Sequence, residues 1–391
     1  MQAPVRLGII GIGNMGSSHA SQVVRGLVPN LVLAAVADRS AARRDWAKEN
    51  LPATVEIFSE GTDLINSGKV DAVIVAIPHY EHPTMSIVAM KNGLHTLCEK
   101  PAGVYTRQVR EMNEVAKDSP VIFGMMFNQR TNPLYRAMKD LISSGELGPI
   151  KRVSWIVTDW YRSQSYYDSG SWRATWAGEG GGVLMNQAPH NIDLLQWICG
   201  LPTKVSAFCH TGKWHNIEVE DDVTAYFEFE NGATGTFVTA TADAPGTNRF
   251  EITCDGGKLV CEDNTLTLWR LKMGEREFNA TYQGGFGQPE FTQEIIPVTG
   301  ENLQHVGVMR AFTDAILAND QSRLIAAGEE GIRGLMLANS MLLSSWLGHP
   351  VDLPIDEQLY FELLQERVAA SNVKPATEAK TFNLDKSFQA T

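Results

Sequence analysis

Residues 5–16 read VRLGIIGIGNMG, a short apolar run followed by three glycines at the spacing G-x-G-x-x-G. A helical pattern continues directly after them, so the stretch has the form of a strand, a tight turn and a helix. In such a turn Gly11 permits the sharp bend, Gly13 lets a pyrophosphate approach the backbone, and Gly16 lets the helix pack closely on the strand. The unpaired N–H groups at the helix start attract phosphate oxygens. We therefore predict a dinucleotide-binding turn; the alternative is an ordinary glycine-rich turn.

A carboxylate stands at the end of the second apolar run, which covers 31–37. Asp38 is placed to accept hydrogen bonds from both ribose hydroxyls of a dinucleotide, and it would repel a 2′-phosphate. This favours NAD over NADP. The neighbouring Arg39 keeps NADP open, because a guanidinium can pair with a 2′-phosphate or lie over the adenine. The alternative for Asp38 is a solvated residue at a strand end.

The first 127 residues alternate short apolar runs with helical stretches. This pattern is typical of a doubly wound parallel sheet with helices on both faces. The predicted strands cover 5–10, 31–37, 72–77, 96–98 and 121–127, and the predicted helices cover 15–26, 40–50, 82–92 and 106–117.

The pattern changes after residue 127 to longer strands in which apolar and polar residues alternate. These predict a second α/β domain over 128–355 with a large, open, mostly antiparallel sheet. A C-terminal helix and a polar arm are expected over 356–391. The predicted strands cover 150–159, 204–211, 224–229, 234–240, 249–254, 258–262 and 265–270, and the predicted helices cover 133–144, 189–198, 305–319 and 328–347.

Composition excludes several classes of partner. The formal charge of −12 argues against nucleic acid and anionic membranes, because both bind basic surfaces. The sequence holds no apolar run near the roughly 20 residues that a membrane span needs. It shows no secretory signal, and its five cysteines have no C-x-x-C spacing, so we expect a cytoplasmic protein without a zinc site.

Two motifs end the third and fourth predicted strands, at the sheet edge where α/β folds bind ligands. Ile77-Pro78-His79 follows the third strand, with His82 shortly after it, and Glu99-Lys100-Pro101 follows the fourth. A lysine at this edge can hydrogen-bond a substrate hydroxyl and stabilise developing alkoxide charge. The alternative for Lys100 is a solvated lysine at a strand end.

A second candidate for proton transfer is His190, in the segment GGGVLMNQAPHNID over 180–193. A helix is predicted from Pro189, so His190 and Asp193 share one face, and Asn186 precedes His190 by four residues. A neutral imidazole can take the proton of an alcohol during oxidation and return it during reduction. A structural histidine and a zinc ligand are the alternatives, although no third ligand has a suitable spacing.

Together these residues resemble the glucose–fructose oxidoreductase, inositol 2-dehydrogenase and MocA family from Val5 to about Leu353. The resemblance implies a Rossmann domain joined to a larger α/β domain whose open sheet packs in a homodimer or homotetramer. It also implies that Lys100 is the catalytic lysine, that His190 is the acid/base, and that Asp193 contacts substrate hydroxyls. The family usually has an aspartate where this chain has Asn186, so a proton relay through that position is in doubt.

Further residues are assigned to the pocket by the resemblance. Asn128 and Arg130 resemble positions at the nicotinamide end, and Trp172-Arg173 resembles an element that reaches cofactor or substrate. Asp159-Trp160-Tyr161-Arg162 suits sugar binding, because aromatic rings stack on C–H faces while charged groups fix hydroxyls. Packing between domains or in an interface is the alternative for both groups.

These expectations combine into an NAD(H)-dependent oxidoreductase that acts on a secondary alcohol or ketone of a sugar, glycoside or cyclitol. The alternatives are a redox-assisted glycoside-cleaving enzyme that recycles bound NAD, and a non-catalytic dinucleotide-binding protein. The expected catalytic residues are Lys100, His190 and Asn186. The expected cofactor-binding residues are Gly11, Ile12, Gly13, Asn14, Met15, Gly16, Asp38, Arg39, Ile77, Pro78, His79, His82, Glu99, Lys100, Asn128, Trp172 and Arg173. The expected substrate-binding residues are Lys100, Asn128, Asp159, Tyr161, Arg162, Asn186, His190 and Asp193.

Overall fold

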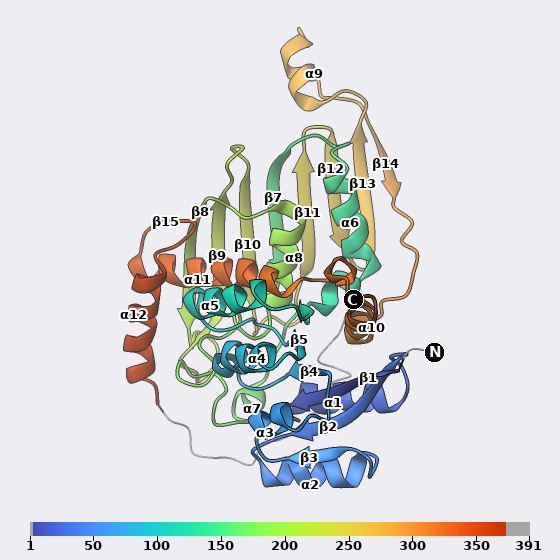
Figure 1. The fold of residues 1–391 in the computed structure, drawn as a ribbon. Coiled ribbons are helices and arrows are strands. Elements are labelled where there is room, and N and C mark those ends of the chain that lie inside the picture. Colours follow the sequence, from blue (N-terminus) through green and yellow to red (C-terminus); the bar gives the residue numbers. More distant parts are fainter. Residues whose placement is uncertain (1–2, 373–391) are drawn as a thin grey trace.

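The computed structural model describes residues 3–372, and their strands form two sheets, one above the other in Figure 1. The lower sheet has six parallel strands in the order β3-β2-β1-β4-β5-β6. Its strands are β1 (Val5–Ile10), β2 (Leu31–Ala37), β3 (Glu56–Phe58), β4 (Ala72–Val75), β5 (His95–Cys98) and β6 (Phe123–Met125). The predicted doubly wound parallel sheet is therefore confirmed.

Helices cover both faces of this sheet, as its apolar strands require. The helices of this part are α1 (Asn14–Val24), α2 (Ala41–Asn50), α3 (Gly61–Asn66), α4 (His82–Lys91) and α5 (Thr106–Lys117). Ala20 and Val23 of α1 pack in one apolar cluster, whereas Leu64 of α3 and Met85 of α4 pack in the cluster on the other face. β3 and α3, which are short and only partly buried, were not predicted from the sequence. β4 and β6 also end earlier in the chain than predicted.

The second sheet has nine strands in the order β14-β13-β12-β11-β7-β10-β9-β8-β15, and its neighbours are antiparallel except for β7 and β10. Its strands are β7 (Ile150–Val157), β8 (Lys204–Thr211), β9 (Glu220–Glu228), β10 (Thr234–Ala240), β11 (Asn248–Cys254), β12 (Gly257–Glu262), β13 (Thr265–Leu271), β14 (Phe291–Ile295) and β15 (Val351–Asp352). The mostly antiparallel second sheet is thus confirmed.

One face of the second sheet is covered and the other is open. Along β7, Val153, Trp155 and Val157 are buried, whereas Ile156 between them is exposed. Tyr226 on β9 is likewise exposed.

The remaining helices of the described chain are α6 (Pro133–Ser143), α7 (Gln164–Tyr167), α8 (Pro189–Cys199), α9 (Glu275–Thr281), α10 (Gln304–Ala318), α11 (Gly331–Leu347) and α12 (Glu357–Ala369), with 3-10 turns at η1 (His79–Glu81), η2 (Asn128–Thr131), η3 (Gln321–Arg323) and η4 (Gly328–Glu330).

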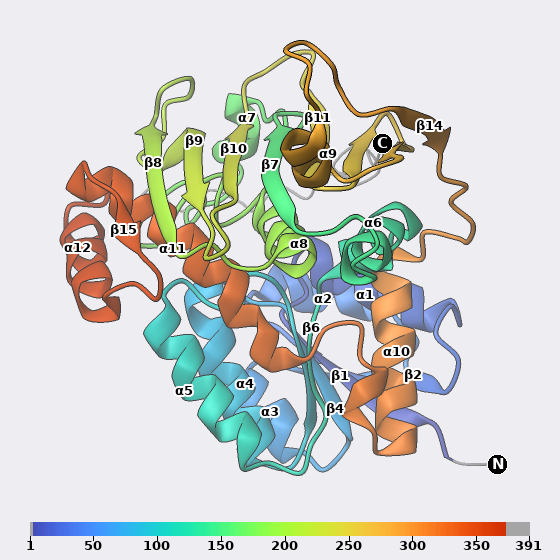
Figure 2. The same cartoon turned by 90° about the horizontal axis from the view of Figure 1, so that it is seen from above.

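The chain returns to the first sheet near its end. Val308, Met309 and Phe312 of α10 pack with Ile9 and Val36, and Figure 2 shows α10 beside the strands of that sheet. The proposed domain boundary between 127 and 128 therefore does not divide the packing cleanly, although it stays a prediction. The predicted C-terminal helix is present as α12, whereas the predicted polar arm lies outside the described residues.

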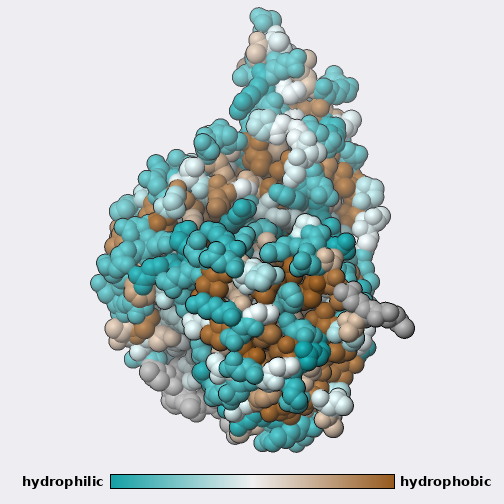
Figure 3. Space-filling view, viewed as in Figure 1, coloured by the Kyte–Doolittle hydropathy of each residue, from teal (hydrophilic) through white to brown (hydrophobic). Residues whose placement is uncertain are grey.

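A hairpin-like arm that carries α9 was not predicted. Figure 3 shows it standing clear of the body of the molecule, with mostly hydrophilic residues at its surface. No residue of α9 is buried. A segment without a buried face has no apolar period, which is why the sequence pattern gave no sign of it.

Candidate functional site

The glycine turn has the geometry that a bound pyrophosphate needs. Gly11 has a φ of +90°, and a Cβ there would lie 2.3 Å from the carbonyl oxygen of Ala76. A Cβ at Gly16 would lie 1.9 Å from the carbonyl oxygen of Gly11. A Cβ at Gly13 would meet nothing within 4 Å, so the space beside its backbone is open. Helix α1 begins at Asn14 without a side-chain cap, which leaves N–H groups for an anion.

The carboxylate of Asp38 lies beside the glycine turn and stabilises it by accepting backbone hydrogen bonds. One carboxylate oxygen accepts from the backbone N–H of Ile12 at 2.7 Å, and the other accepts from that of Ser40 at 2.8 Å. The guanidinium of Arg39 forms ion pairs with two other carboxylates, those of Glu60 at 3.0 Å and Glu81 at 3.3 Å. The guanidinium next to Asp38 is therefore held by acidic partners.

Sequence reasoning missed Arg43, which lies on the first turns of α2. Its guanidinium donates to the backbone carbonyls of Ile12 and Gly13 and lines the pocket described below. Burial lowers the pKa of Arg43, and the charge of Asp38 opposes that shift. Arg43 could have been selected from the sequence, because in this type of fold the helix that follows the carboxylate-bearing strand begins close to the glycine turn.

A pocket runs from the glycine turn to the residues expected to carry out the chemistry. It is lined by Gly13, Asn14, Met15, Arg43, Ala76, Ile77, His79, His82, Glu99, Lys100, Trp160, Arg162, Tyr166, Ser169, Trp172, Arg173, Asn186, Gln187, His190 and His305. The structure thus brings together all three residues expected to be catalytic, which are Lys100, Asn186 and His190. Besides Arg43, the sequence analysis did not select Ala76, Tyr166, Ser169, Gln187 or His305.

Ten of the residues expected to bind substrate or cofactor lie outside this lining. Five of them, Gly11, Ile12, Gly16, Asp38 and Arg39, belong to the glycine turn and the strand end beside it, and the other five lie elsewhere. Asn128 donates to Gln304, and the carboxylate of Asp159 accepts from Asn248 at 3.2 Å. Tyr161 is 54% exposed and does not line the pocket, so the ring that faces it from this cluster is Trp160. Pro78 also lies outside the lining and precedes η1.

The fifth of these other residues is Asp193, whose carboxylate is occupied inside the protein. Arg130 donates to both of its oxygens, at 2.8 and 2.7 Å, and also pairs with Glu330 at 2.8 Å. The two side chains of the Arg130–Asp193 pair are each 1% exposed. The expected contact of Asp193 with substrate hydroxyls does not fit this arrangement, because the pair joins α8 to η2 behind the pocket.

Lys100 follows β5 and is held inside the pocket wall. Its Nζ donates to the backbone carbonyl of Asn186 at 2.9 Å. Burial lowers the pKa of Lys100, and the charges of Glu99 and Glu179 oppose that shift. Glu99 pairs with the buried His19 at 2.7 Å; burial disfavours its ionised form, but His19 outweighs this effect and lowers the pKa of Glu99 to about 2. A buried ammonium group among fixed carboxylates is suited to interact with developing negative charge.

His190 is the second residue of α8 and is buried. Its Nδ1 has no hydrogen-bond partner within the described protein. Burial is the main reason that its pKa lies well below the usual value, and the charges of Lys100 and His305 add to the effect. The imidazole is therefore neutral at neutral pH and able to accept a proton.

Tyr166 on α7 connects the residues of the opposite wall. Its hydroxyl accepts from Arg173 at 2.7 Å and from Gln187 at 3.3 Å, and it donates to the side-chain oxygen of Asn186 at 3.3 Å. The guanidinium groups of Arg162 and Arg173 lie 5.2 and 4.5 Å from the centre of its ring. This wall is thus built from side chains that hold one another.

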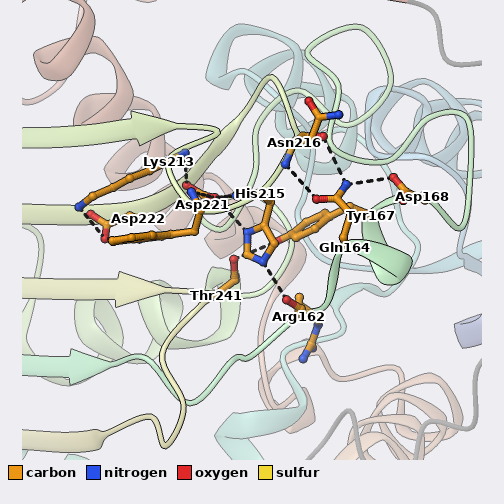
Figure 4. A network of polar contacts seen from close by, with 11 residues as sticks. Arg162, Gln164, Tyr167, Asp168, Lys213, His215, Asn216, Asp221, Asp222 and Thr241 are labelled. Carbon is orange, nitrogen blue, oxygen red and sulfur yellow. Dashed lines mark hydrogen bonds and ion pairs between the residues drawn. The ribbon is translucent and has the colours of Figure 1, made fainter.

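A second polar network holds the segment that carries Arg162, as Figure 4 shows. His215 contacts the backbone carbonyl of Arg162 at 2.9 Å and the carboxylate of Asp221 at 3.0 Å. The hydroxyls of Tyr167 and Thr241 are 2.7 Å apart. These contacts tie the segment that carries Arg162 to β9 and to the end of β10.

Within residues 3–372, no three His, Cys, Asp or Glu side chains are grouped as a metal ion would require. None of the helices in this part of the chain is long and apolar enough to cross a bilayer.

Two family models match the chain: an oxidoreductase family with an NAD-binding Rossmann fold over residues 5–127, and the GFO/IDH/MocA C-terminal domain over residues 135–260. The 1,5-anhydro-D-fructose reductase of Ensifer adhaerens is 26% identical over 353 residues, which are 89% of this chain and 98% of that one. The scyllo-inositol 2-dehydrogenase (NAD(+)) of Bacillus subtilis is 29% identical over 243 residues, 60% of this chain and 67% of that one.

Among solved structures, the WlbA dehydrogenase of Chromobacterium violaceum in complex with NADH and UDP-GlcNAcA has a TM-score of 0.75 and 26% identity. The match covers 91% of this chain and 98% of that one. The likeness therefore extends over both sheets.

Proposed function

Because the chain belongs to the GFO/IDH/MocA family of oxidoreductases, we propose that it transfers a hydride between NAD(H) and a sugar, glycoside or cyclitol. The reacting group of the substrate is a secondary alcohol or ketone. The observation that carries the proposal is the continuity of the pocket, which has Gly13 at one end and Lys100 with His190 at the other.

The residues of the glycine turn fit a dinucleotide. The open space beside Gly13 and the uncapped start of α1 suit a pyrophosphate, and the carboxylate of Asp38 beside the turn suits the hydroxyls of a ribose. When bound, the nicotinamide supplies or accepts the hydride. NAD is proposed over NADP because the carboxylate of Asp38 would repel a 2′-phosphate, while Arg39 is held by Glu60 and Glu81.

His190 and Lys100 handle the proton and the charge of the substrate oxygen. In oxidation the neutral imidazole of His190 takes the hydroxyl proton as the hydride leaves the carbon. The ammonium of Lys100 donates a hydrogen bond to the same oxygen and stabilises its partial negative charge. In reduction His190 returns the proton. Asn186 donates or accepts hydrogen bonds at a substrate hydroxyl, since an amide does not take up the proton.

The opposite wall selects the substrate. Trp160, Tyr166 and Trp172 offer ring faces for the C–H groups of a sugar or cyclitol, and Arg162 offers donors for its hydroxyls. We further propose that the open face of the second sheet, with Ile156 and Tyr226 exposed, packs in a homodimer or homotetramer, and that the protein is cytoplasmic.

The test is a screen of the purified protein with NAD or NADP against inositols, monosaccharides and glycosides, followed at the nicotinamide absorbance. We expect NADH to form in equal amounts with an oxidised product for at least one substrate, and NADP to be the poorer cofactor. Glycoside cleavage without net NADH formation would favour the redox-assisted alternative. Binding of NAD with no conversion of any substrate would favour a non-catalytic role.

A further inference from the structure

Glu179 is a buried carboxylate that the chemistry above does not use. It directly precedes Gly180 and is 2% exposed. One of its oxygens accepts from the backbone N–H of Ala174 at 2.7 Å, and the other accepts from the side-chain amide of Asn186. The guanidinium of Arg173 approaches it at 4.0 Å. A carboxylate is costly to bury, and here two hydrogen-bond donors and the nearby charge of Arg173 compensate for its lost hydration.

Asn186 connects this carboxylate to Lys100. Its side chain donates to Glu179, and its backbone carbonyl accepts from Nζ of Lys100 at 2.9 Å. Its side-chain oxygen also accepts from the hydroxyl of Tyr166 at 3.3 Å. The side chain of Asn186 is thus held by a carboxylate, and its backbone carbonyl is held by an ammonium group.

We propose that Glu179 is a positioning residue for Lys100, which fixes Asn186 by hydrogen bonding and supplies negative charge that keeps Lys100 protonated in the buried site. The assignment rests on the proposed function, because that function gives Lys100 its role. Asn186 carries no charge, so the carboxylate that acts on this part of the pocket stands one hydrogen bond behind it.

The charges around Lys100 show why a second carboxylate matters. Glu99 and Glu179 favour its ammonium form, whereas burial and the charges of Arg162 and Arg173 disfavour it. The charge of Glu99 is shared with His19 at 2.7 Å. Burial is the main cause that lowers the pKa of four nearby histidines, and the charge of Lys100 lowers it further. These are His79, His82, His190 and His305.

Glu179 in turn faces cationic and acidic neighbours. Burial raises its pKa, while Arg173, the N–H of Ala174, Asn186 and Lys100 favour the ionised form. Glu220 is the nearby acid, and the charge of Glu179 contributes to the raised pKa of Glu220, for which burial is the main cause. Removing the charge of Glu179 therefore removes one of the two carboxylates that support the ammonium form of Lys100.

The experiment compares Glu179→Gln, Asn186→Asp and the double variant with both changes. Glu179→Gln keeps a hydrogen-bonding side chain but loses the charge. We expect kcat to fall about 10- to 100-fold, as for misplaced catalytic groups, with a smaller change in KM. We also expect the alkaline limb of the kcat/KM profile to move to lower pH by about one unit, since a nearby opposite charge supports the protonated amine.

The double variant moves the carboxylate by one position and restores an amide–carboxylate pair. We expect it to recover activity over Glu179→Gln. Asn186→Asp alone places a second carboxylate next to that of Glu179, and the two negative charges repel each other. We therefore expect this variant to lose activity. The matched control is Glu220→Gln, a buried glutamate that accepts from the N–H groups of Gly182 and Leu184 in the same loop. It is expected to change thermal stability but not the alkaline limb.

A second measurement does not depend on cofactor or turnover. The pKa of Lys100 is obtained in cofactor-free protein from the pH dependence of reductive methylation at that residue, followed by mass spectrometry. We expect a lower value in Glu179→Gln than in the natural protein. An unchanged Lys100 pKa with an unchanged alkaline limb, or a double variant no better than Glu179→Gln, overturns the proposal. If the natural protein lacks redox activity, the proposed function fails, and the methylation result still decides whether Glu179 acts on Lys100.

Discussion

The two ends of the pocket are built in different ways. At the cofactor end the main chain does the binding: Gly11, Gly13 and Gly16 shape the turn, and the start of α1 offers its own N–H groups. At the reacting end the surface is made of side chains that hold one another, with Tyr166 bonded to three neighbours. The main-chain end is therefore sensitive to a few glycines, whereas the side-chain end depends on charges and hydrogen-bond partners.

Burial increases this difference. Lys100, Glu99, Glu179 and His190 are withdrawn from water, so the charge on each depends on specific neighbours. The glycine turn has no such dependence, because backbone N–H groups do not titrate. The comparison predicts that changes at the reacting end alter rate and pH dependence, while changes at the cofactor end alter affinity.

The largest effect is expected for Lys100→Ala and His190→Ala. Each removes a group assigned to proton or charge handling, so turnover should fall about 100- to 10,000-fold. NAD binding, measured by titration calorimetry, should not be abolished, because neither side chain belongs to the glycine turn. Turnover close to that of the natural protein in either variant would contradict its role, and loss of NAD binding in both would contradict the separation of the two ends.

The buried Arg130–Asp193 pair should give the largest loss of stability. Arg130→Met leaves the carboxylate of Asp193 buried without its cationic partner, which costs about 3–5 kcal/mol. Arg6→Met is the matched control, since it breaks an Arg–Asp pair at 2.6 Å whose side chains are 47% and 41% exposed. That change should cost less than about 1 kcal/mol. Urea unfolding compares the two, and equal losses would show that burial does not decide the result.

The sequence predicted the main-chain end better than the side-chain end. The spacing of Gly11, Gly13 and Gly16 has a direct geometric meaning, so both the turn and the sheet below it could be predicted. Lys100, Asn186 and His190 also reached the pocket as expected. The family resemblance stated from these motifs is confirmed by the matching family models.

The residues whose place or role the sequence did not predict have one physical feature in common. Tyr166 and His305 face the pocket because of tertiary packing, and no local period of the sequence marks them. Asp193 shares a helix with His190, yet its partner Arg130 lies 63 residues away, and spacing along α8 cannot show that the carboxylate is already occupied. Glu179 was passed over for the same reason, since only the fold sets it against Asn186.

The histidines around the pocket should make the protein sensitive to mild acid. Burial is the main cause that lowers the pKa of His79, His82 and His190, and it lowers that of His305 to about 3. Between the folded value and the unfolded value of about 6.5, the unfolded chain binds more protons. Stability is therefore lost as the pH falls below about 6.5, and for His305 alone the loss at pH 5 is about 2 kcal/mol.

Urea unfolding at pH 7 and pH 5 measures this loss. Glu99 acts in the same direction but adds little to this loss, because a carboxyl whose pKa is lowered to about 2 loses its contribution mainly below its unfolded value of about 4.5. His305→Gln should reduce the difference between the free energies of unfolding measured at pH 7 and at pH 5. Equal free energies of unfolding at pH 7 and pH 5 would show that these imidazoles are not kept neutral by burial.

The smallest effect is expected at the cofactor end, from Asp38→Asn. The amide keeps one acceptor oxygen for the N–H of Ile12, so the turn should stay folded, but the charge that meets the ribose hydroxyls is lost. NAD binding should weaken about tenfold, the scale of one hydrogen bond to a charged group, and NADP binding should strengthen relative to it. Asp45→Asn, an exposed pair with Lys48 on the neighbouring helix, is the control and should change neither affinity. Because no group that handles the proton is altered, kcat at saturating NAD should stay within about twofold of the natural value. A large fall in kcat with unchanged affinity would mean that the two ends of the pocket are coupled, and that the main chain does more than hold the cofactor.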